Sequence, residues 1–373
     1  MTQRFIAILI KETREIWRDP YTLLMAIILP LIMLFLFAYA TNLDVEDVPL
    51  AVYDQDQTRA SREYVQQFTT AGDKFHLHHA VRSDQELEQL MARDVVEVGL
   101  VIPPGFGEAL RAGRPATVQT WVDGSFPPTA NVAIGYVTAF NQVYSARQVA
   151  ARLGQGYQPA LMIEPRVWYN PGLKYINFVV PGLFAVILLA FPPLLSALAV
   201  VREKEQGSIQ QIFVSPIRPA ELILGKLIPY GVIAFVEMAI IFAVGIGWFQ
   251  VPFEGSLTLL LVAALIYVFG TVSIGLLIST LTNSQVAAAL AAIVLTVMPA
   301  LLFSGFIFPI FNMPLVSQGF THLFPARHFV EIGRSISLKG VGLATLWPQL
   351  GWMLAYVLVI FSLASLRFKK KMG

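Results

Sequence analysis

Long runs of apolar residues, separated by short polar stretches, dominate the pattern of this chain. Six runs are long enough to cross a bilayer as helices, at residues 21–41, 173–201, 222–248, 257–281, 286–308 and 346–366. About 20 apolar residues span the ~30 Å hydrocarbon core at a rise of about 1.5 Å per residue. The pattern therefore predicts a polytopic α-helical membrane protein with six transmembrane helices.

Residues 1–20 repeat basic and apolar side chains at helical spacing. This pattern is typical of an amphipathic helix that lies in the headgroup layer of a membrane. Trp17 and Arg18 stand near its end, and Asp19 with Pro20 terminates it. We expect a cytoplasmic interfacial helix here.

Residues 42–172 have a different pattern, with shorter apolar runs and more charge. Alternating segments predict strands at 48–53, 75–79, 95–102 and 116–122, and helices at 59–68, 83–91, 104–111 and 130–153. Strands that alternate with short helices predict a compact α/β domain with a mixed sheet. This domain is inserted between the first two spans.

Residues 309–345 mix apolar segments with prolines, histidines and charged residues. They are too polar and too interrupted to span the bilayer. We interpret them as short interfacial or re-entrant helices.

Positive charge gives the orientation, although the net charge is only +2. Four basic residues precede the first span, four lie between Arg202 and Lys226, and four form the tail 367–373. By the positive-inside rule these three segments are cytoplasmic. Both termini then lie in the cytoplasm, and the α/β domain lies outside it.

Composition excludes several classes of protein. The chain is 56% hydrophobic and 13% charged, against about 25% charged residues in soluble proteins. It contains no cysteine, so disulfides and thiol chemistry are excluded. Nothing in the charge pattern indicates a nucleic-acid partner.

The polar segment 202–221 separates the second span from the third. Glu203, Glu205 and Gly207 precede Ser208, which forms a capping-box pattern with Gln211. Three apolar residues then follow on one helical face, and a proline ends the segment: Ile209, Ile212, Phe213 and Pro216. The pattern fits a short capped helix that is either a docking element or a simple interfacial loop helix.

Several of these segments resemble the ABC-2 type transporter permeases. They are REKEQGS at 202–208, FVSP at 213–216, ELILGK at 221–226, LFSGFIFP at 302–309, MP at 313–314 and PARHF at 325–329. KE at 11–12 and RDP at 18–20 fit as well, and the large insert after the first span is similar to that of bacterial drug-export-like members.

The resemblance implies a function and a set of partners. It implies a bacterial inner-membrane permease that exports a hydrophobic or amphipathic, drug-like compound. It also implies pairing with a second permease chain, as a homodimer or a heterodimer, on a dimer of ABC ATPase subunits. Segment 202–221 would be the ATPase-coupling helix. A periplasmic adaptor protein often accompanies this subgroup.

The chain should not be an ATPase itself. It lacks the G-x-x-x-x-G-K-[ST] loop that cradles nucleotide phosphates. We therefore expect no cofactor or metal in this chain, with ATP and Mg²⁺ bound by the partner.

Further candidates are charged residues in or near the spans. Glu237 is the one acid deep in a span, and is interpreted either as part of a substrate path or as a buried packing acid. Arg327, Glu331 and Arg334 share one helical face, and either form a gate or anchor an interfacial helix.

Two alternatives remain open. Intramembrane acids would favour a sodium-efflux permease of the same family, and Glu237 is the single candidate. A membrane sensor with a ligand-binding outer domain is the alternative from another class. His76, His78 and His79 do not make a convincing metal site, because a third fixed ligand is lacking.

Overall fold

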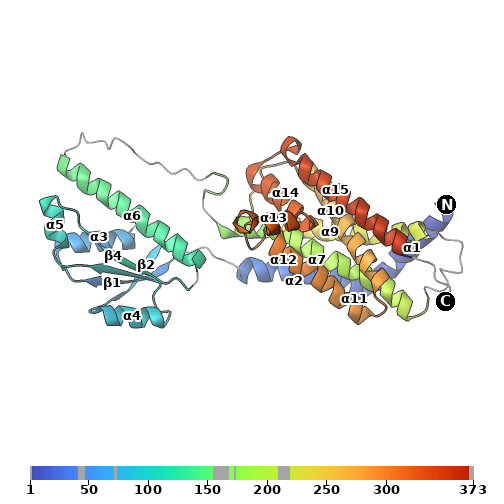
Figure 1. Ribbon diagram of the computed structural model, residues 1–373, viewed down its shortest axis with the longest axis horizontal. Coiled ribbons are helices and arrows are strands. Elements are labelled where there is room, and N and C mark those ends of the chain that lie inside the picture. Colours follow the sequence, from blue (N-terminus) through green and yellow to red (C-terminus); the bar gives the residue numbers. More distant parts are fainter. Residues whose placement is uncertain are drawn as a thin grey trace. The chain divides into compact units, whose positions relative to one another are not determined.

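The chain divides into two units. The structure, a computed structural model, describes residues 2–40, 47–70, 74–125, 127–153, 168–171, 174–208 and 219–368. One unit comprises Met1–Asn42 and Val167–Gly373, and the other comprises Leu43–Arg166 (Figure 1). Each unit is described by itself below.

The smaller unit is built on a four-stranded mixed sheet in the order β2-β1-β3-β4. β1 (Val48–Asp54) pairs in parallel with β2 (Phe75–Ala80) and β3 (Val98–Ile102), and β4 (Gln119–Val122) runs antiparallel to β3. The helices of this unit are α3 (Arg59–Thr70), α4 (Asp84–Ala92), α5 (Phe106–Ala112) and α6 (Pro127–Leu153).

Aromatic packing holds this unit together on one side of the sheet. Tyr64 and Phe68 of α3 meet the rings of Phe75, Phe106 and Tyr144, with centroids 5.1–5.5 Å apart. Two strands start later than the apolar pattern indicates, β3 at Val98 instead of residue 95 and β4 at Gln119 instead of residue 116, whereas β1 and β2 start where expected. Asp94, shortly before β3, adopts a positive φ.

The larger unit is helical. Among the described residues, six helices are long and apolar enough to cross a membrane. They are α2 (Pro20–Ala40), α7 (Tyr175–Glu205), α9 (Pro219–Gly247), α10 (Leu257–Leu281), the segment Gln285–Phe303 and α15 (Leu343–Arg367). This confirms the prediction of a polytopic helical membrane protein.

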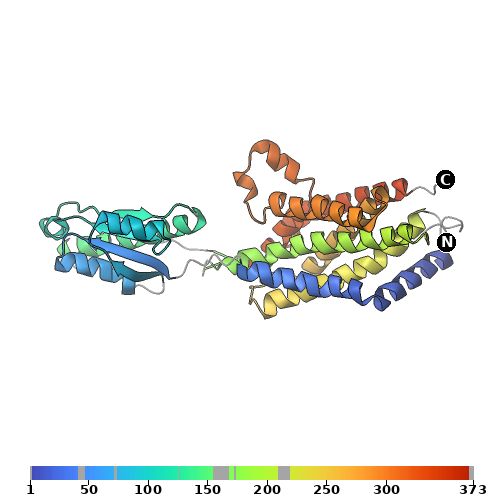
Figure 2. The same ribbon diagram turned by 90° about the horizontal axis from the view of Figure 1, so that it is seen from below.

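Figure 2 shows α1 (Thr2–Arg18) leaving α2 at an angle, with the turn between them at Asp19. The Asp19 carboxylate accepts hydrogen bonds from the backbone N–H groups of Tyr21 (3.0 Å) and Thr22 (3.2 Å). Asp19 is thus the N-cap of the first span.

α7 forms the centre of this unit and is buried along most of its length. It contains Pro181, Pro192 and Pro193, which break the backbone hydrogen-bond ladder. The hydroxyl of Ser196 donates to the carbonyls of Pro193 (3.2 Å) and Val272 of α10 (3.1 Å). These bonds, together with the absent side chain of Gly275, let α10 approach α7 closely.

The ends of two spans differ most from the sequence expectation. α7 continues past residue 201 to Glu205, so the first charged residues of segment 202–221 extend a membrane helix. The fifth span ends at Phe303 rather than at 308, and Gly305 takes a positive φ in the following turn. It consists of α11 (Gln285–Ala292), a π-helical turn (Ile293–Val297) and α12 (Met298–Phe303).

Residues 309–345 form η2 (Ile310–Asn312), α13 (Leu315–Thr321) and α14 (Pro325–Lys339). α14 is not a surface helix, because most of its residues are buried against the spans. Phe329 of α14 stacks on Tyr267 of α10 with centroids 4.3 Å apart.

Candidate functional site: a charged cluster at the end of helix α7

Four consecutive charged residues, Arg202, Glu203, Lys204 and Glu205, form the last turn of α7. Successive side chains on an α-helix are rotated by about 100°. These four therefore point in different directions, and each contacts a different neighbouring element. The arrangement joins the end of the central helix to α1, the turn before α2, α9, α10 and α11.

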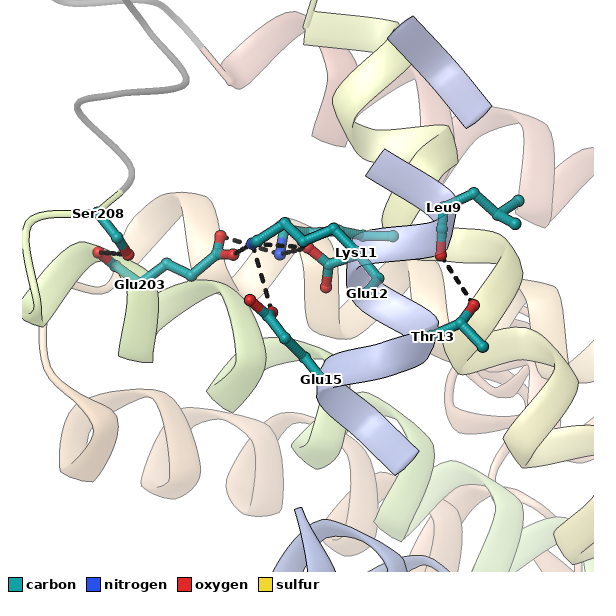
Figure 3. Close-up of polar contacts among 8 residues, drawn as sticks. Leu9, Lys11, Glu12, Thr13, Glu15, Glu203 and Ser208 are labelled. Carbon is teal, nitrogen blue, oxygen red and sulfur yellow. Dashed lines mark hydrogen bonds and ion pairs between the residues drawn. The ribbon is translucent and has the colours of Figure 1, made fainter. Parts of the chain in front are cut away.

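Glu203 enters a buried ionic cluster between α1, α7 and α9 (Figure 3). Lys226 of α9 places its ammonium 2.7 Å from Glu12 Oε1 and 2.9 Å from Glu203 Oε2. The side chains of Lys226, Glu12 and Glu203 are only 1%, 2% and 9% exposed. Lys11 completes the cluster with a second ion pair to Glu203.

Lys11 lies at the rim of this cluster, with 41% of its side chain exposed. It is 3.3 Å from both Glu12 Oε1 and Glu15 Oε2. Burial alone would lower the pKa of Lys11, but Glu12, Glu203 and Glu15 outweigh it and raise the pKa above 10.5. Oxygens of the three acids lie within 4.8 Å of one another, and each acid has a lysine as its ion-pair partner, so we interpret the group as an ion-pair cluster and not as a metal site.

Arg202 points to the turn between α1 and α2. Its Nη1 lies 2.6 Å from Asp19 Oδ2, while Asp19 also accepts from the hydroxyl of Thr22 at 2.8 Å. Partial burial raises the pKa of Asp19, but hydrogen bonds from Arg202 and Thr22 outweigh this and lower it from 3.8 to about 2. The same carboxylate therefore caps α2 and ties it to α7.

Lys204 and Glu205 contact the hairpin formed by α10 and α11. Lys204 donates to the carbonyls of Ser279 and Thr282 (3.0 Å to Thr282), at the C-terminus of α10. Glu205 accepts from the backbone N–H of Gln285 (2.7 Å), at the N-terminus of α11. A cation at a helix C-terminus and an anion at a helix N-terminus both interact favourably with the helix dipoles.

α7 ends at Glu205, and Gly207, two residues later, takes a positive φ of 73° that suits the absence of a side chain. The hydroxyl of Ser208 donates back to the carbonyl of Glu203 at 3.3 Å. Gln211, the expected capping partner of Ser208, lies outside the described residues, as do Ile209, Ile212, Phe213 and Pro216.

Comparison with known proteins identifies the family of this chain. The family described as "ABC-2 family transporter protein" matches residues 20–366. The chain belongs to the ABC-2 transporter family. It is 32% identical to the probable multidrug ABC transporter permease YbhS of Escherichia coli K12, over 99% of this chain and 98% of that protein.

Two further relatives support this assignment. Probable multidrug ABC transporter permease YbhR of Escherichia coli K12 is 33% identical over the full length of both chains. The inner membrane transport permease YhhJ of the same organism is 27% identical over 98% of this chain and 96% of its own. The chain is thus a permease component of an ABC-2 type transporter and not an ATPase.

Of the four residues in the ionic cluster of this permease, the sequence predicts a functional role only for Glu203. The sequence pattern assigns Lys11 and Glu12 to an interfacial helix and Lys226 only to a sequence motif. One signal was present: Glu12 lies on the same helical stripe as Ile8 and Ile16, both buried. An acid at the centre of the apolar face of a helix indicates a buried partner.

Trp17 and Arg18, the other N-terminal candidates, lie in the last turn of α1, just before the turn at Asp19. Trp17 is 79% exposed and Arg18 is exposed, and neither joins the ionic cluster.

The three candidates on α14 do not act as one group. Arg334 is drawn into the helix bundle, where it donates to the carbonyls of Phe178 (3.1 Å), Gly305 (2.8 Å) and Phe306 (3.3 Å). Its guanidinium lies 3.6 Å from the centroid of the Phe178 ring.

Arg327 and Glu331 have other partners. Arg327 donates to Thr321 Oγ1 and, at 2.8 Å, to the carbonyl of Gln318, both on α13. Glu331 accepts from Gln349 of α15 at 2.8 Å. Arg327 and Arg334 thus bind polar groups of α7, α13 and the turn after α12, and Glu331 one of α15. These contacts fit anchoring better than a gate of ion pairs between the three.

Glu237 lies in the middle of α9 and is 1% exposed. Neither of its carboxyl oxygens has a hydrogen-bond partner among the described residues. A carboxyl group without a partner in a membrane-spanning helix is costly, and such groups usually mark a functional position.

The histidines of the smaller unit do not form a ligand cluster. His76 and His78 are exposed on β2, and His78 stacks on His79 with centroids 4.8 Å apart. Within the described part of the chain, no group of three metal-binding side chains includes them.

Proposed function

We propose that this permease is the membrane subunit of an ABC exporter, and that an ATPase drives it through the end of α7. The observation that carries this proposal is the charged turn Arg202, Glu203, Lys204 and Glu205. It connects the start of the α7–α9 loop to α1, α2, α9, α10 and α11. A force on this loop would reach all these helices through these ion pairs and hydrogen bonds.

The orientation belongs to the proposal. The three basic segments of the sequence place both termini and the loop in the cytoplasm, where an ATPase is available. Within the helical unit, α1 and the end of α15 lie at the same end as the end of α7 (Figure 1). The α/β unit, inserted between α2 and α7, would then be extracytoplasmic, in a bacterial inner membrane.

The partners follow from the family and from the relatives. We propose a dimer of permease chains on two ATPase subunits, with ATP and Mg²⁺ bound only by the ATPases. The paired names YbhS and YbhR favour a heterodimer. An adaptor protein bound to the α/β unit completes the expected assembly.

The substrate class is proposed from the relatives named as multidrug permeases and from Glu237. We infer outward transport of a hydrophobic or amphipathic compound, with Glu237 on the transport path. The Glu237→Gln variant keeps the volume and removes the titratable carboxyl group, so we expect normal abundance in the membrane with reduced export of a cationic dye. Unchanged export would contradict this role.

The test of coupling uses the whole assembly in proteoliposomes. Phe213→Asp places a charge on the apolar face predicted for the loop, and Gly207→Pro removes the residue that allows a positive φ at the end of α7. We expect both to abolish stimulation of the ATPase and export while the permease remains in the membrane. Lys339→Met, at an exposed end of α14, is the matched control. Wild-type export in both loop variants would refute the proposal.

Sodium efflux is tested in the same assay. If Na⁺ is the transported species, ATP hydrolysis should follow Na⁺ concentration and dye export should be absent. Capture of a ligand by the α/β unit without any ATPase partner would instead favour a sensor.

A further inference from the structure

A groove runs between α1, α2 and α7 beside the ionic cluster, with a volume of about 920 Å³. Binding sites for small molecules typically have volumes of about 300–1,000 Å³. Its lining combines charged residues of α1 and of the end of α7 with apolar residues. Met25 of α2 and Leu195, Leu198 and Ala199 of α7 form the part called the apolar wall below.

Aromatic side chains locate this groove relative to the membrane. Trp17 and Tyr21 are exposed at the turn between α1 and α2. At the other end of α2, Tyr39 and Trp248 are also exposed, and Trp248 Nε1 donates to the Tyr39 hydroxyl at 2.9 Å. Tyr21 and Tyr39 are about 27 Å apart along the helix, close to the ~30 Å of a hydrocarbon core.

Exposed Trp and Tyr side chains concentrate at the two headgroup layers of a membrane. Tyr21 lines the groove, so the groove opens at the headgroup level. Met25 lies one helical turn beyond Tyr21, about 6 Å closer to the membrane centre. The apolar wall thus extends from the headgroup layer toward the acyl chains.

The lining of the groove carries four acidic and four basic residues, but its ion pairs do not use all of the basic ones, because Lys226 from outside the lining also pairs with the acids. All four acids of its wall have a basic partner: Glu12 and Glu203 pair with Lys226 and Lys11, Glu15 with Lys11, and Asp19 with Arg202. Arg14 and Arg18 remain. Both are exposed on the groove, and neither has an ion-pair partner among the described residues.

Arg14 and Arg18 are four residues apart and therefore lie on the same face of α1. Guanidinium groups bind phosphate oxygens with directed, charge-assisted hydrogen bonds. Two free guanidinium groups beside an apolar wall match a phosphate that carries acyl chains.

We propose that this groove is a binding site for one anionic phospholipid with a phosphodiester headgroup, such as phosphatidylglycerol. The phosphate binds Arg14 and Arg18, and an acyl chain lies along Met25, Leu195 and Leu198. The lipid then fills the space between the interfacial helix and the helix that carries the charged cluster. It would link the position of α1 to the composition of the membrane.

The test uses the full-length protein in a neutral detergent and measures bound lipid by native mass spectrometry. The probes are dioleoylphosphatidylglycerol, dioleoylphosphatidylcholine and inorganic phosphate. We expect one molecule of phosphatidylglycerol to bind at least tenfold more tightly than phosphatidylcholine. Equal affinity for the two lipids would overturn the charge-based recognition.

Three variants separate the groove from general surface charge. Arg14→Gln with Arg18→Gln should weaken binding at least tenfold, and Ala199→Trp should do the same by filling the groove without changing charge. Arg367→Gln removes an exposed positive charge at the end of α15 and should bind as the wild type. Only variants whose melting temperature without added lipid equals that of the wild type are compared.

Other results overturn the proposal. Wild-type affinity in either groove variant would exclude the groove as the site. Equal weakening by Arg367→Gln would show adsorption by charge alone. Binding of inorganic phosphate with the same dependence on Arg14 and Arg18 would assign the site to a free anion instead of a lipid.

Discussion

Replacing Lys226 with methionine tests the buried cluster at the end of α7. The variant keeps the length and apolar stem of the side chain and removes the ammonium that lies 2.7 Å from Glu12 and 2.9 Å from Glu203. Two buried carboxylates would then share only Lys11, whose side chain is 41% exposed.

The expected cost follows from this loss. Removing one partner of a buried ion pair typically destabilises a protein by about 3–5 kcal/mol, because the other charge remains buried and unpaired. Lys11 compensates in part, so we expect the lower end, about 3 kcal/mol. This corresponds to roughly a hundredfold change in the ratio of folded to unfolded protein.

The measurement is the free energy of unfolding in mixed micelles, titrated with a denaturing detergent. The double variant Lys226→Met with Glu12→Gln removes both partners, so its cost should be smaller than the sum of the single costs by at least about 1 kcal/mol. Lys339→Met, which changes an exposed lysine, should stay within about 0.5 kcal/mol of the wild type.

Two results would refute the reasoning. A loss below about 1 kcal/mol in Lys226→Met would mean that the ammonium does not stabilise the buried acids. Strict additivity of the single costs in the double variant would mean that Lys226 and Glu12 do not interact.

Three further predictions concern packing, pH and buried charge. Gly275→Ala places a Cβ 2.1 Å from the carbonyl oxygen of Pro193, so we expect a loss of about 1–3 kcal/mol and a lower melting temperature, whereas Gly351→Ala, in open space, should be neutral. Arg334→Met leaves three carbonyls without their donor and should cost about 2–3 kcal/mol; a stable variant would contradict the anchoring role. The pKa of Asp19 is lowered from 3.8 to about 2, so its stabilisation is complete above pH 4 and is lost as the pH falls toward 2. The stability difference between wild type and Asp19→Asn should therefore shrink from pH 5 to pH 2. A difference that stays constant would contradict a stabilising role for the ionised Asp19 carboxylate.

The spans and the sheet could be predicted from sequence, because both depend on local hydrophobic periodicity. Runs of apolar residues located all six membrane helices, and alternation located β1 to β4 to within three residues. The predicted ends of helices were less accurate where charged residues continue a membrane helix. Residues 202–205 continue α7 because each charged side chain finds a partner on a neighbouring helix.

The ionic cluster could not be predicted in full, because Glu12 and Lys226 are 214 positions apart in the sequence. Nothing in the local pattern around Lys226 indicates which acid it meets. On α14, sequence spacing correctly placed Arg327, Glu331 and Arg334 near one another along the helix. It did not reveal that Arg334 turns inward to backbone carbonyls, since such acceptors carry no sequence signal.

The last turn of α7 has a consequence for how this protein tolerates change. Because its four neighbouring charged residues each have partners on separate helices, a substitution at any one of them alters a contact far away in the chain. Charge reversal at position 203, for example, would require compensating reversals at positions 11 and 226. Positions 11, 12, 203 and 226 should therefore change in concert when many relatives are aligned, whereas Arg14 and Arg18 are free to vary independently of them.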